Sequence, residues 1–291
     1  MSEYCIYLDA DSSDMSEEHI LPLSLGGVDV FSIQADRRFN NTVGSSVDGA
    51  VANDFLILFK RDRAGSKGHS GKHPVPVIKR AELEDGSPVQ ARLGKEGLRL
   101  FDVKKRRDLT PAEANNLVVK LSGSLDMNAE VKFLAKVALA AGYFAYGEQF
   151  RASVRHSEAR MILNAASLTD IRPEVRMWSR FESVDDKRPE EIERLNILRA
   201  MTESAGGSCV ILMPGPGTFS VVVGVLGDFM GMISMPADTS NFPNAGDYQM
   251  GHCIFLQDGQ MVRRSFYASL LSTLIKQEND RVMAASTPEA P

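Results

Sequence analysis

The stretch that decides the N-terminal fold is "EEHILPLSLGG", residues 17–27. It sets a glutamate beside a histidine, in a chain of 291 residues with only 5 histidines, and continues as an apolar run interrupted by a proline. It ends in two adjacent glycines, which are a strong turn signal. Alternating side chains in "VFSIQA" (30–35) predict the returning strand. The stretch therefore predicts a hairpin with a glutamate-histidine pair at its mouth.

A helix is predicted directly after this hairpin. Between residues 36 and 59, apolar side chains recur every three or four positions, as on the buried face of an amphipathic helix. These side chains are Val43, Val47, Ala50, Val51, Phe55 and Leu58. Residues 4–8 ("YCIYL") predict a short strand ahead of the hairpin. The expected order is therefore strand, strand, helix.

The rest of the chain predicts an α+β fold. Short strands separated by the turn sequences "EDGS" and "GKEG" predict a β-meander at 75–103, and "TPAE" (110–113) is a capping box that begins a helix. Further helices are predicted at 128–147, 150–164, 189–202 and 267–276. Residues 165–190 are interpreted as a connection, and the strands beyond it predict a C-terminal antiparallel sheet with helices. We therefore expect three parts, at residues 1–60, 61–165 and 166–291.

The composition excludes several classes of protein. A hydrophobic content of 43% and a charged content of 24% are typical of soluble globular chains. No run approaches the roughly 18 apolar residues of a membrane span. The 3 cysteines are far apart and none lies in a C-x-x-C pair, which indicates a reducing compartment. We therefore expect a cytoplasmic protein without a membrane partner.

One segment departs from the net charge of −5. Residues 60–80 hold seven Lys or Arg residues against a single acid, in a loop rich in Gly and Ser. Cationic side chains and backbone N–H groups of such a loop can contact phosphates together. The candidates for phosphate contact are Arg61, Arg63, Lys67 and Lys72. The alternative interpretation is a solvated run of charges.

A glutamate-histidine pair on a hairpin, followed by paired asparagines at the start of a helix, resembles the HNH (ββα-metal) nuclease superfamily. The similarity is to the group whose members contain C-x-x-C, E-H-I-x-P-x-S-L-G-G, C-x-x-C-N-N-x-x-G-S and a helix that ends A-N-D. The matching residues are Glu18, His19, Ile20, Pro22, Ser24, Leu25, Gly26, Gly27, Asn40, Asn41, Gly44, Ser45, Ala52, Asn53 and Asp54. The resemblance extends over residues 4–165 and is most specific at 17–54.

This resemblance implies a metal-dependent endonuclease that hydrolyses phosphodiester bonds in DNA. It assigns His19 as the general base, because histidine readily exchanges a proton near neutral pH. It assigns Glu18 and Asn40 as oxygen ligands of one Mg²⁺ or Mn²⁺ ion, whose charge stabilises the phosphate during cleavage. Asn41 is expected to support the loop through its side-chain amide.

Each of these features alone has a simpler interpretation. A glutamate-histidine pair on a surface hairpin is usually structural or solvated, and Asn40-Asn41 would serve as a helix N-cap. The nuclease interpretation depends on their combination, in this order and on these elements.

The chain departs from the group at the positions of the structural zinc. The two C-x-x-C pairs correspond to Cys5 with Leu8 and to Asp36 with Phe39. Because a structural zinc site normally takes four ligands, we expect no structural zinc. We expect instead that Leu8 packs against Phe39 and replaces the metal crosslink.

Two further hypotheses stay open, the first because of the lost zinc ligands and the second because nothing in the sequence separates RNA from DNA as the substrate. The chain is alternatively a catalytically inactive, HNH-derived protein that binds nucleic acid or another partner. RNA is an alternative substrate to DNA. For residues 166–291, which carry no recognisable motif, oligomerisation (a homo-oligomer included), target choice and regulation are the roles considered.

Overall fold

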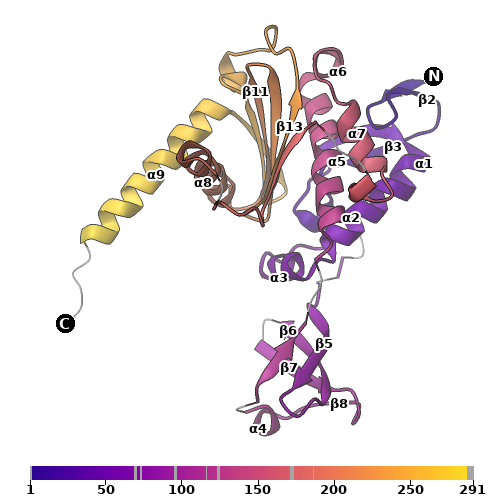
Figure 1. The fold of residues 1–291 in the computed structure, drawn as a ribbon, viewed down its shortest axis with the longest axis vertical. Coiled ribbons are helices and arrows are strands. Elements are labelled where there is room, and N and C mark those ends of the chain that lie inside the picture. The colour runs from indigo at the N-terminus through magenta and orange to yellow at the C-terminus, as the bar shows by residue number, and fades with distance from the viewer. Residues whose placement is uncertain are drawn as a thin grey trace.

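The computed structural model describes residues 2–68, 71–72, 74–94, 97–115, 117–122, 125–170, 174–185 and 187–286. Helices and antiparallel sheets make up this structure, so the predicted α+β class is confirmed. Small sheets lie in the N-terminal half, and a six-stranded sheet with helices lies in the C-terminal half. The long helix α5 (Met127–Tyr146) runs between the N-terminal elements and the C-terminal sheet (Figure 1).

The N-terminal elements, residues 2–63, form what we call the hairpin module. Its strands are β1 (Glu3–Cys5), β2 (Ala10–Ser12), β3 (Met15–His19) and β4 (Ser32–Asp36). β1 pairs with β2 and β3 pairs with β4, both antiparallel. Its helical segments are η1 (Leu23–Leu25), α1 (Arg37–Phe39), the π-helical turn η2 (Asn40–Gly44), α2 (Ser45–Ala52) and α3 (Phe55–Arg63). The hairpin and helical segments after it are thus present, in the predicted order. The strand predicted at residues 4–8 ends already at Cys5, and the first strand of the hairpin ends at His19, before the apolar run that contains η1.

The single helix predicted for residues 36–59 is wrong in its extent. The Asp36 carboxylate accepts a hydrogen bond from the backbone N–H of Phe39 and so begins α1. The Asp54 carboxylate accepts from the backbone N–H groups of the first turn of α3 and begins a separate helix. The first backbone N–H groups of a helix have no partner within the helix, and these two carboxylates accept hydrogen bonds from them. The two caps therefore fix where each helix begins and where the chain changes direction.

Two glycines close the hairpin. Gly26 ends η1 with a φ of 80°, a left-handed conformation that glycine adopts without a steric cost. At Gly27 an ideal Cβ would lie 1.8 Å from the carbonyl oxygen of Leu21, so no larger residue fits. The Ser208 hydroxyl of the C-terminal sheet donates to the Leu25 carbonyl. The loop is therefore held both by its own backbone and by the sheet.

A five-stranded sheet extends away from the rest of the molecule (Figure 1). Its strands are β5 (Val77–Leu83), β6 (Pro88–Gly94), β7 (Gly97–Asp102), β8 (Arg107–Asp108) and β9 (Val119–Leu121). Their order is β8-β7-β6-β5-β9, which confirms the predicted meander and adds a strand at each edge. The predicted capping box at Thr110 begins the short helix α4 (Pro111–Ala114).

The C-terminal sheet has the strand order β10-β13-β12-β11-β14-β15, with all neighbours antiparallel. Its strands are β10 (Arg176–Ser179), β11 (Ser208–Gly215), β12 (Thr218–Val225), β13 (Asp228–Pro236), β14 (His252–Gln257) and β15 (Gln260–Ser265). The accompanying helical segments are α6 (Glu148–Ser153), α7 (Ser157–Asn164), η3 (Leu168–Asp170), α8 (Pro189–Ser204), η4 (Gly246–Tyr248) and α9 (Phe266–Ser286). The connection predicted for residues 165–190 is therefore wrong in part, because β10 lies within it and forms the edge of the sheet next to β13.

Helices cover both faces of the C-terminal sheet. α5 contacts one face, and α8 and α9 lie on the other (Figure 1). Alternation along β12 explains this arrangement: Val221 and Val223 are in the same buried cluster as α5, whereas Val222 packs with α8. The cluster around α5 also contains the apolar side chains of the hairpin module, so one core joins that module to the sheet. Within the described residues, no helix combines the length and apolar character needed to cross a bilayer.

Candidate active site

The glutamate of the hairpin lies in a buried ion cluster. Glu18, on β3, is 5% exposed and contacts the ammonium group of Lys136, which is 0% exposed on α5. The same ammonium donates to both carboxylate oxygens of Asp48 on α2, at 2.9 and 2.8 Å. It also donates to the backbone oxygen of His19 at 3.4 Å. Glu18, Asp48 and Lys136 are called the lysine cluster below.

The charges of the lysine cluster do not balance. Burial by itself lowers the pKa of Lys136, but the carboxylates of Asp48 and Glu18 outweigh it and the pKa is raised overall. Burial raises the pKa of Asp48 to about 6, Lys136 opposes this rise, and the charge of Glu18 adds to it. One ammonium therefore serves two carboxylates. When both are ionised, the cluster holds one surplus negative charge.

Asn40 brings a second oxygen toward Glu18. Its side-chain nitrogen donates to the Ser16 hydroxyl at 3.1 Å and to the Glu17 carbonyl at 3.0 Å, which ties the π-helical turn to β3. An ideal Cβ on Gly44 would lie 3.3 Å from Asn40 Oδ1 and 3.4 Å from Glu18 Oε1. The amide and carboxylate oxygens therefore both border one position, at Gly44, that holds no side chain. π-Helical turns of this kind often occur at functional sites.

His19 lies at the partly exposed end of β3, beside this pair. Its Nε2 atom is 3.1 Å from Asp29 Oδ1, in the loop that leads to β4. A carboxylate bound to one ring nitrogen orients an imidazole. Asp29 was not identified from the sequence, because no spacing rule links it to His19.

One polar atom of this region, the hydroxyl of Tyr7, is buried without a hydrogen bond to any described residue. Burial raises the pKa of Tyr7, and the negative charges of Glu18 and Asp48 raise it further. Glu18 Oε1 is also buried, and it contacts the ammonium of Lys136. Most buried polar atoms in proteins are paired, so the unpaired Tyr7 hydroxyl beside one surplus charge marks an incomplete polar site.

Two side-chain oxygens beside Gly44 are of the kind that binds Mg²⁺, which commonly takes only one or two ligands from the protein and keeps several waters. They are the amide oxygen of Asn40 and a carboxylate oxygen of Glu18, near a surplus negative charge. The Glu18 oxygen also contacts the ammonium of Lys136, so a cation there would share this carboxylate with the lysine. Among the described residues, no group of three His, Cys, Asp or Glu side chains is arranged to hold a metal ion. A cation at Glu18 would therefore depend on Asn40 and solvent for its remaining ligands.

Asn41, the expected supporting residue, is placed differently from Asn40. Its side chain is exposed and makes no hydrogen bond with the described residues, while its backbone oxygen accepts from the Ser45 hydroxyl at 2.7 Å. The amide that fixes the turn to the hairpin is that of Asn40.

The four positions that correspond to zinc ligands do come together, but not by the expected packing. The backbone N–H of Asp36 donates to the sulfur of Cys5 at 3.4 Å. Phe39 is buried and stacks on Tyr7, with ring centroids 4.4 Å apart. Leu8 is 45% exposed, so the predicted packing of Leu8 on Phe39 is wrong. The chain turns back at Cys5, whose carbonyl accepts from Leu8 N–H, and this turn presents Tyr7 rather than Leu8 to the interior.

The basic loop begins beside the hairpin. The Ser66 hydroxyl donates to the carbonyls of Leu23 and Ser24, at 3.3 and 3.0 Å. The exposed cations of this segment include Arg63, Lys67 and Lys72. The positive charge therefore starts next to the loop that follows His19.

Arg61 is an exception among the predicted phosphate contacts. It is only 7% exposed, and its Nη1 donates to the Ala52 carbonyl at 2.7 Å. Burial lowers the pKa of Arg61. Its guanidinium closes α2 against α3 instead of facing solvent, so the prediction that it contacts phosphate is corrected.

Asp48 and Lys136 were also not identified from the sequence. They lie 88 residues apart, and only the packing of α2 on α5 brings them together. One signal was present: Lys136 interrupts the apolar stretch Phe133–Leu139, where an unpaired lysine would be costly to bury. A lysine in such a position indicates a buried acidic partner without identifying it.

Comparisons with known proteins identify no relative. No protein-family model matches the chain, no curated protein is significantly similar to it, and no solved structure matches it significantly. The resemblance to HNH nucleases therefore rests on the residues named above.

Proposed function

We propose that this protein is a metal-dependent endonuclease of the HNH type that hydrolyses phosphodiester bonds in DNA. The observation that carries the proposal is that Glu18 Oε1 and Asn40 Oδ1 border the same position at Gly44, with His19 adjacent in the chain to Glu18. A carboxylate ligand, an amide ligand and a base from one hairpin and its helix are the groups that metal-assisted hydrolysis requires.

In this proposal each residue has a separate task. Glu18 and Asn40 would hold the divalent cation, which supplies positive charge to the scissile phosphate. His19 takes a proton from the attacking water, and Asp29 positions its imidazole through the 3.1 Å contact. Lys136 holds Glu18 in place from the buried side.

The exposed cations of the loop after α3 would bind the DNA backbone. Arg63, Lys67 and Lys72 follow the segment that Ser66 anchors to the hairpin. Phosphate contacts of this kind position a duplex without reading its sequence. The proposal therefore includes DNA binding that weakens as the salt concentration rises.

The test is cleavage of supercoiled plasmid DNA in Mg²⁺ or Mn²⁺. We expect His19→Ala to lower the nicking rate by about 10²–10⁴-fold, the usual contribution of a general base, and Glu18→Gln to abolish metal-dependent cleavage. Glu17→Gln is the matched control, because the exposed carboxylate of Glu17 lies on the same strand and accepts a hydrogen bond from the Ser32 hydroxyl alone among the described residues. EDTA should stop the wild-type reaction. Equal nicking by wild type and His19→Ala would refute the assignment.

The second candidate is an HNH-derived protein that binds nucleic acid without cutting it. One observation favours it: the ammonium of Lys136 already contacts Glu18 and partly neutralises the proposed ligand. The same samples decide between the two. Retarded migration of DNA without nicking, in either metal, would support the binding protein, and a parallel assay with single-stranded RNA tests RNA as the substrate.

A further inference from the structure

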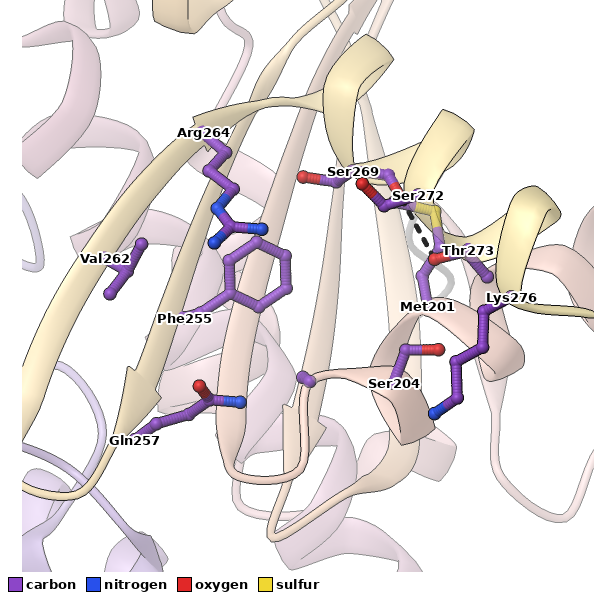
Figure 2. A pocket seen from close by; sticks show the side chains of 11 residues that line it. Met201, Ser204, Phe255, Gln257, Val262, Arg264, Ser269, Ser272, Thr273 and Lys276 are labelled. Carbon is purple, nitrogen blue, oxygen red and sulfur yellow. Dashed lines mark hydrogen bonds between the residues drawn. The ribbon is translucent and has the colours of Figure 1, made fainter.

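A cavity of about 250 Å³ lies far along the chain from the candidate active site, between the end of α8, the strands β14 and β15, and α9 (Figure 2). Strand alternation directs Phe255 and Gln257 from β14, and Val262 and Arg264 from β15, to the same face of the sheet. They form the floor, and α9 forms one wall. The cavity is thus built by regular elements and not by loops.

The wall that α9 contributes is polar. The side chains of α9 that line the cavity recur at the spacing of one helix face: Ser269, Ser272, Thr273 and Lys276. Apolar side chains of the same helix, including Leu271, Leu274 and Ile275, are exposed. A helix packed on a sheet usually turns its apolar side inward. The reversed arrangement places hydroxyl groups and a cation around the cavity.

Hydrogen bonds within α9 satisfy only some of the polar side chains of this wall. The buried hydroxyls of Ser269 and Thr273 donate to backbone carbonyls one turn earlier in the helix, at 2.9 and 3.0 Å. The hydroxyl of Ser272 and the ammonium of Lys276 have no hydrogen-bond partner among the described residues. Their donors remain available to a ligand.

The cavity carries positive charge that no carboxylate balances. Arg264 from the β15 side and Lys276 from the α9 side both line it (Figure 2). Neither forms an ion pair with a described residue, and no Asp or Glu lines the cavity in the described part of the chain. By contrast, the neighbouring Arg263 points to the other face of the sheet, where its guanidinium lies 4.8 Å from the ring centre of Phe144. Two cations and adjacent hydroxyls suit a phosphate monoester, which carries a charge of about −1.5 to −2 at neutral pH.

We propose that this cavity binds a small phosphate monoester, with the phosphate between Arg264 and Lys276 and the organic part against Phe255 and Val262. The two apolar side chains of the floor, Phe255 and Val262, favour a monoester over bare phosphate, because they can cover the organic part. The volume of about 250 Å³ limits the ligand to a small molecule. This proposal does not depend on nuclease activity.

The experiment is isothermal titration calorimetry of the full chain in EDTA, with 5′-AMP, ribose 5-phosphate, inorganic phosphate and adenosine as probes. We expect at least one of the two monoesters to bind more tightly than inorganic phosphate or adenosine. Arg264→Gln and Lys276→Gln should each weaken that binding by at least about tenfold. Arg281→Gln is the matched control, since Arg281 is an exposed cation of α9 that does not line the cavity.

Three outcomes would overturn the proposal. They are the absence of binding by both monoesters at millimolar concentration, equal weakening by Arg281→Gln, and binding of inorganic phosphate as tight as that of the monoesters. The substituted side chains are exposed, so unfolding curves of the variants should match wild type and show that a loss of binding is local.

Discussion

Two buried clusters of this protein combine the same charges around different cations. Each contains two carboxylates and one cation. The lysine cluster is Glu18, Asp48 and Lys136, and the second, called the arginine cluster, is Asp54, Glu130 and Arg180. Each therefore holds one surplus negative charge when both carboxylates are ionised.

The arginine cluster is fully bonded. The guanidinium of Arg180 contacts both oxygens of Glu130 and donates to Asp54 Oδ1 at 3.2 Å. That same Asp54 oxygen also accepts from the backbone at the start of α3. A planar guanidinium can serve several oxygens at once, which a compact ammonium cannot do with the same geometry. These contacts tie α5, α3 and the chain after β10 together, and no side-chain nitrogen or oxygen of the cluster is buried without a partner.

The lysine cluster is less completely bonded. The ammonium of Lys136 contacts Glu18 Oε1 and donates to both oxygens of Asp48, while the nearby Tyr7 hydroxyl lacks a hydrogen bond among the described residues. Burial and charge alone therefore do not identify the candidate site. The amide oxygen of Asn40 beside Glu18, and the adjacent His19, distinguish it from the arginine cluster.

The largest expected effect is the loss of either cation. Lys136→Met leaves two buried carboxylates without a countercharge, and we expect it to lower the free energy of unfolding by about 3–5 kcal/mol. Arg180→Met should lower it by a similar amount for the same reason. Urea denaturation at pH 7 measures both losses.

Lys132→Met is the control for Lys136→Met. Lys132 lies one turn earlier on α5, is half-buried and donates only to the Ala165 carbonyl. Its replacement should cost about 1 kcal/mol or less. If Lys136→Met lowers the free energy of unfolding by as little as this, the lysine cluster is hydrated. It could then not be compared with the arginine cluster as a second buried cluster.

The second prediction uses the raised pKa of Asp48. Between its ordinary pKa of 3.8 and its folded pKa of about 6, Asp48 is protonated in the native state and ionised in the unfolded chain. The native state then binds more protons, so the free energy of unfolding falls as the pH rises through this window. The contribution of this group should fall by roughly 3 kcal/mol, at 1.36 kcal/mol for each pH unit of the pKa difference.

Asp48→Asn isolates this effect, because it keeps the shape of the side chain and removes the titration. Subtracting its unfolding free energy from that of wild type, from pH 4 to pH 7, cancels the carboxylates that titrate elsewhere. The difference should decline with rising pH. A difference that is flat or rises would mean that Asp48 is ionised throughout the window and that Lys136 fully compensates it.

The sequence predicted local features of the site better than distant ones. The hairpin, its two glycines and the asparagines of the next helix are fixed by short-range geometry, so their pattern is visible in residues 17–54. Lys136 reaches the site only through tertiary packing, and Asp29 reaches it only through a loop. No residue spacing in the sequence indicates that either one lies there. Arg61 shows the opposite error: its charge suggested a phosphate contact, but the packing of α3 buried it.

The same reasoning explains the errors in the fold. The strand β10 is short and gains its hydrogen bonds only from β13, far along the chain, so residues 176–179 lack a signal of their own. The helix predicted for residues 36–59 has the right apolar period, but local caps at Asp36 and Asp54 divide it. Periodicity predicts which side is buried, whereas side-chain caps decide where an element ends.

The smallest expected effect concerns two glycines of one helical segment. Gly44 lies beside the oxygens of Glu18 and Asn40, and Gly49 does not. Gly49, in α2, has nothing within 4 Å of an ideal Cβ, so Gly49→Ala should stabilise the protein by about 0.5–1 kcal/mol through helix propensity. Gly44 is also helical, with a φ of −57°, but its Cβ would enter the space between the two oxygens. Gly44→Ala should therefore gain no stability and should weaken Mn²⁺ binding several-fold, measured by titration calorimetry, while Gly49→Ala leaves that binding unchanged. Equal gains in stability and equal Mn²⁺ affinities would show that the two oxygens do not share a ligand at this position.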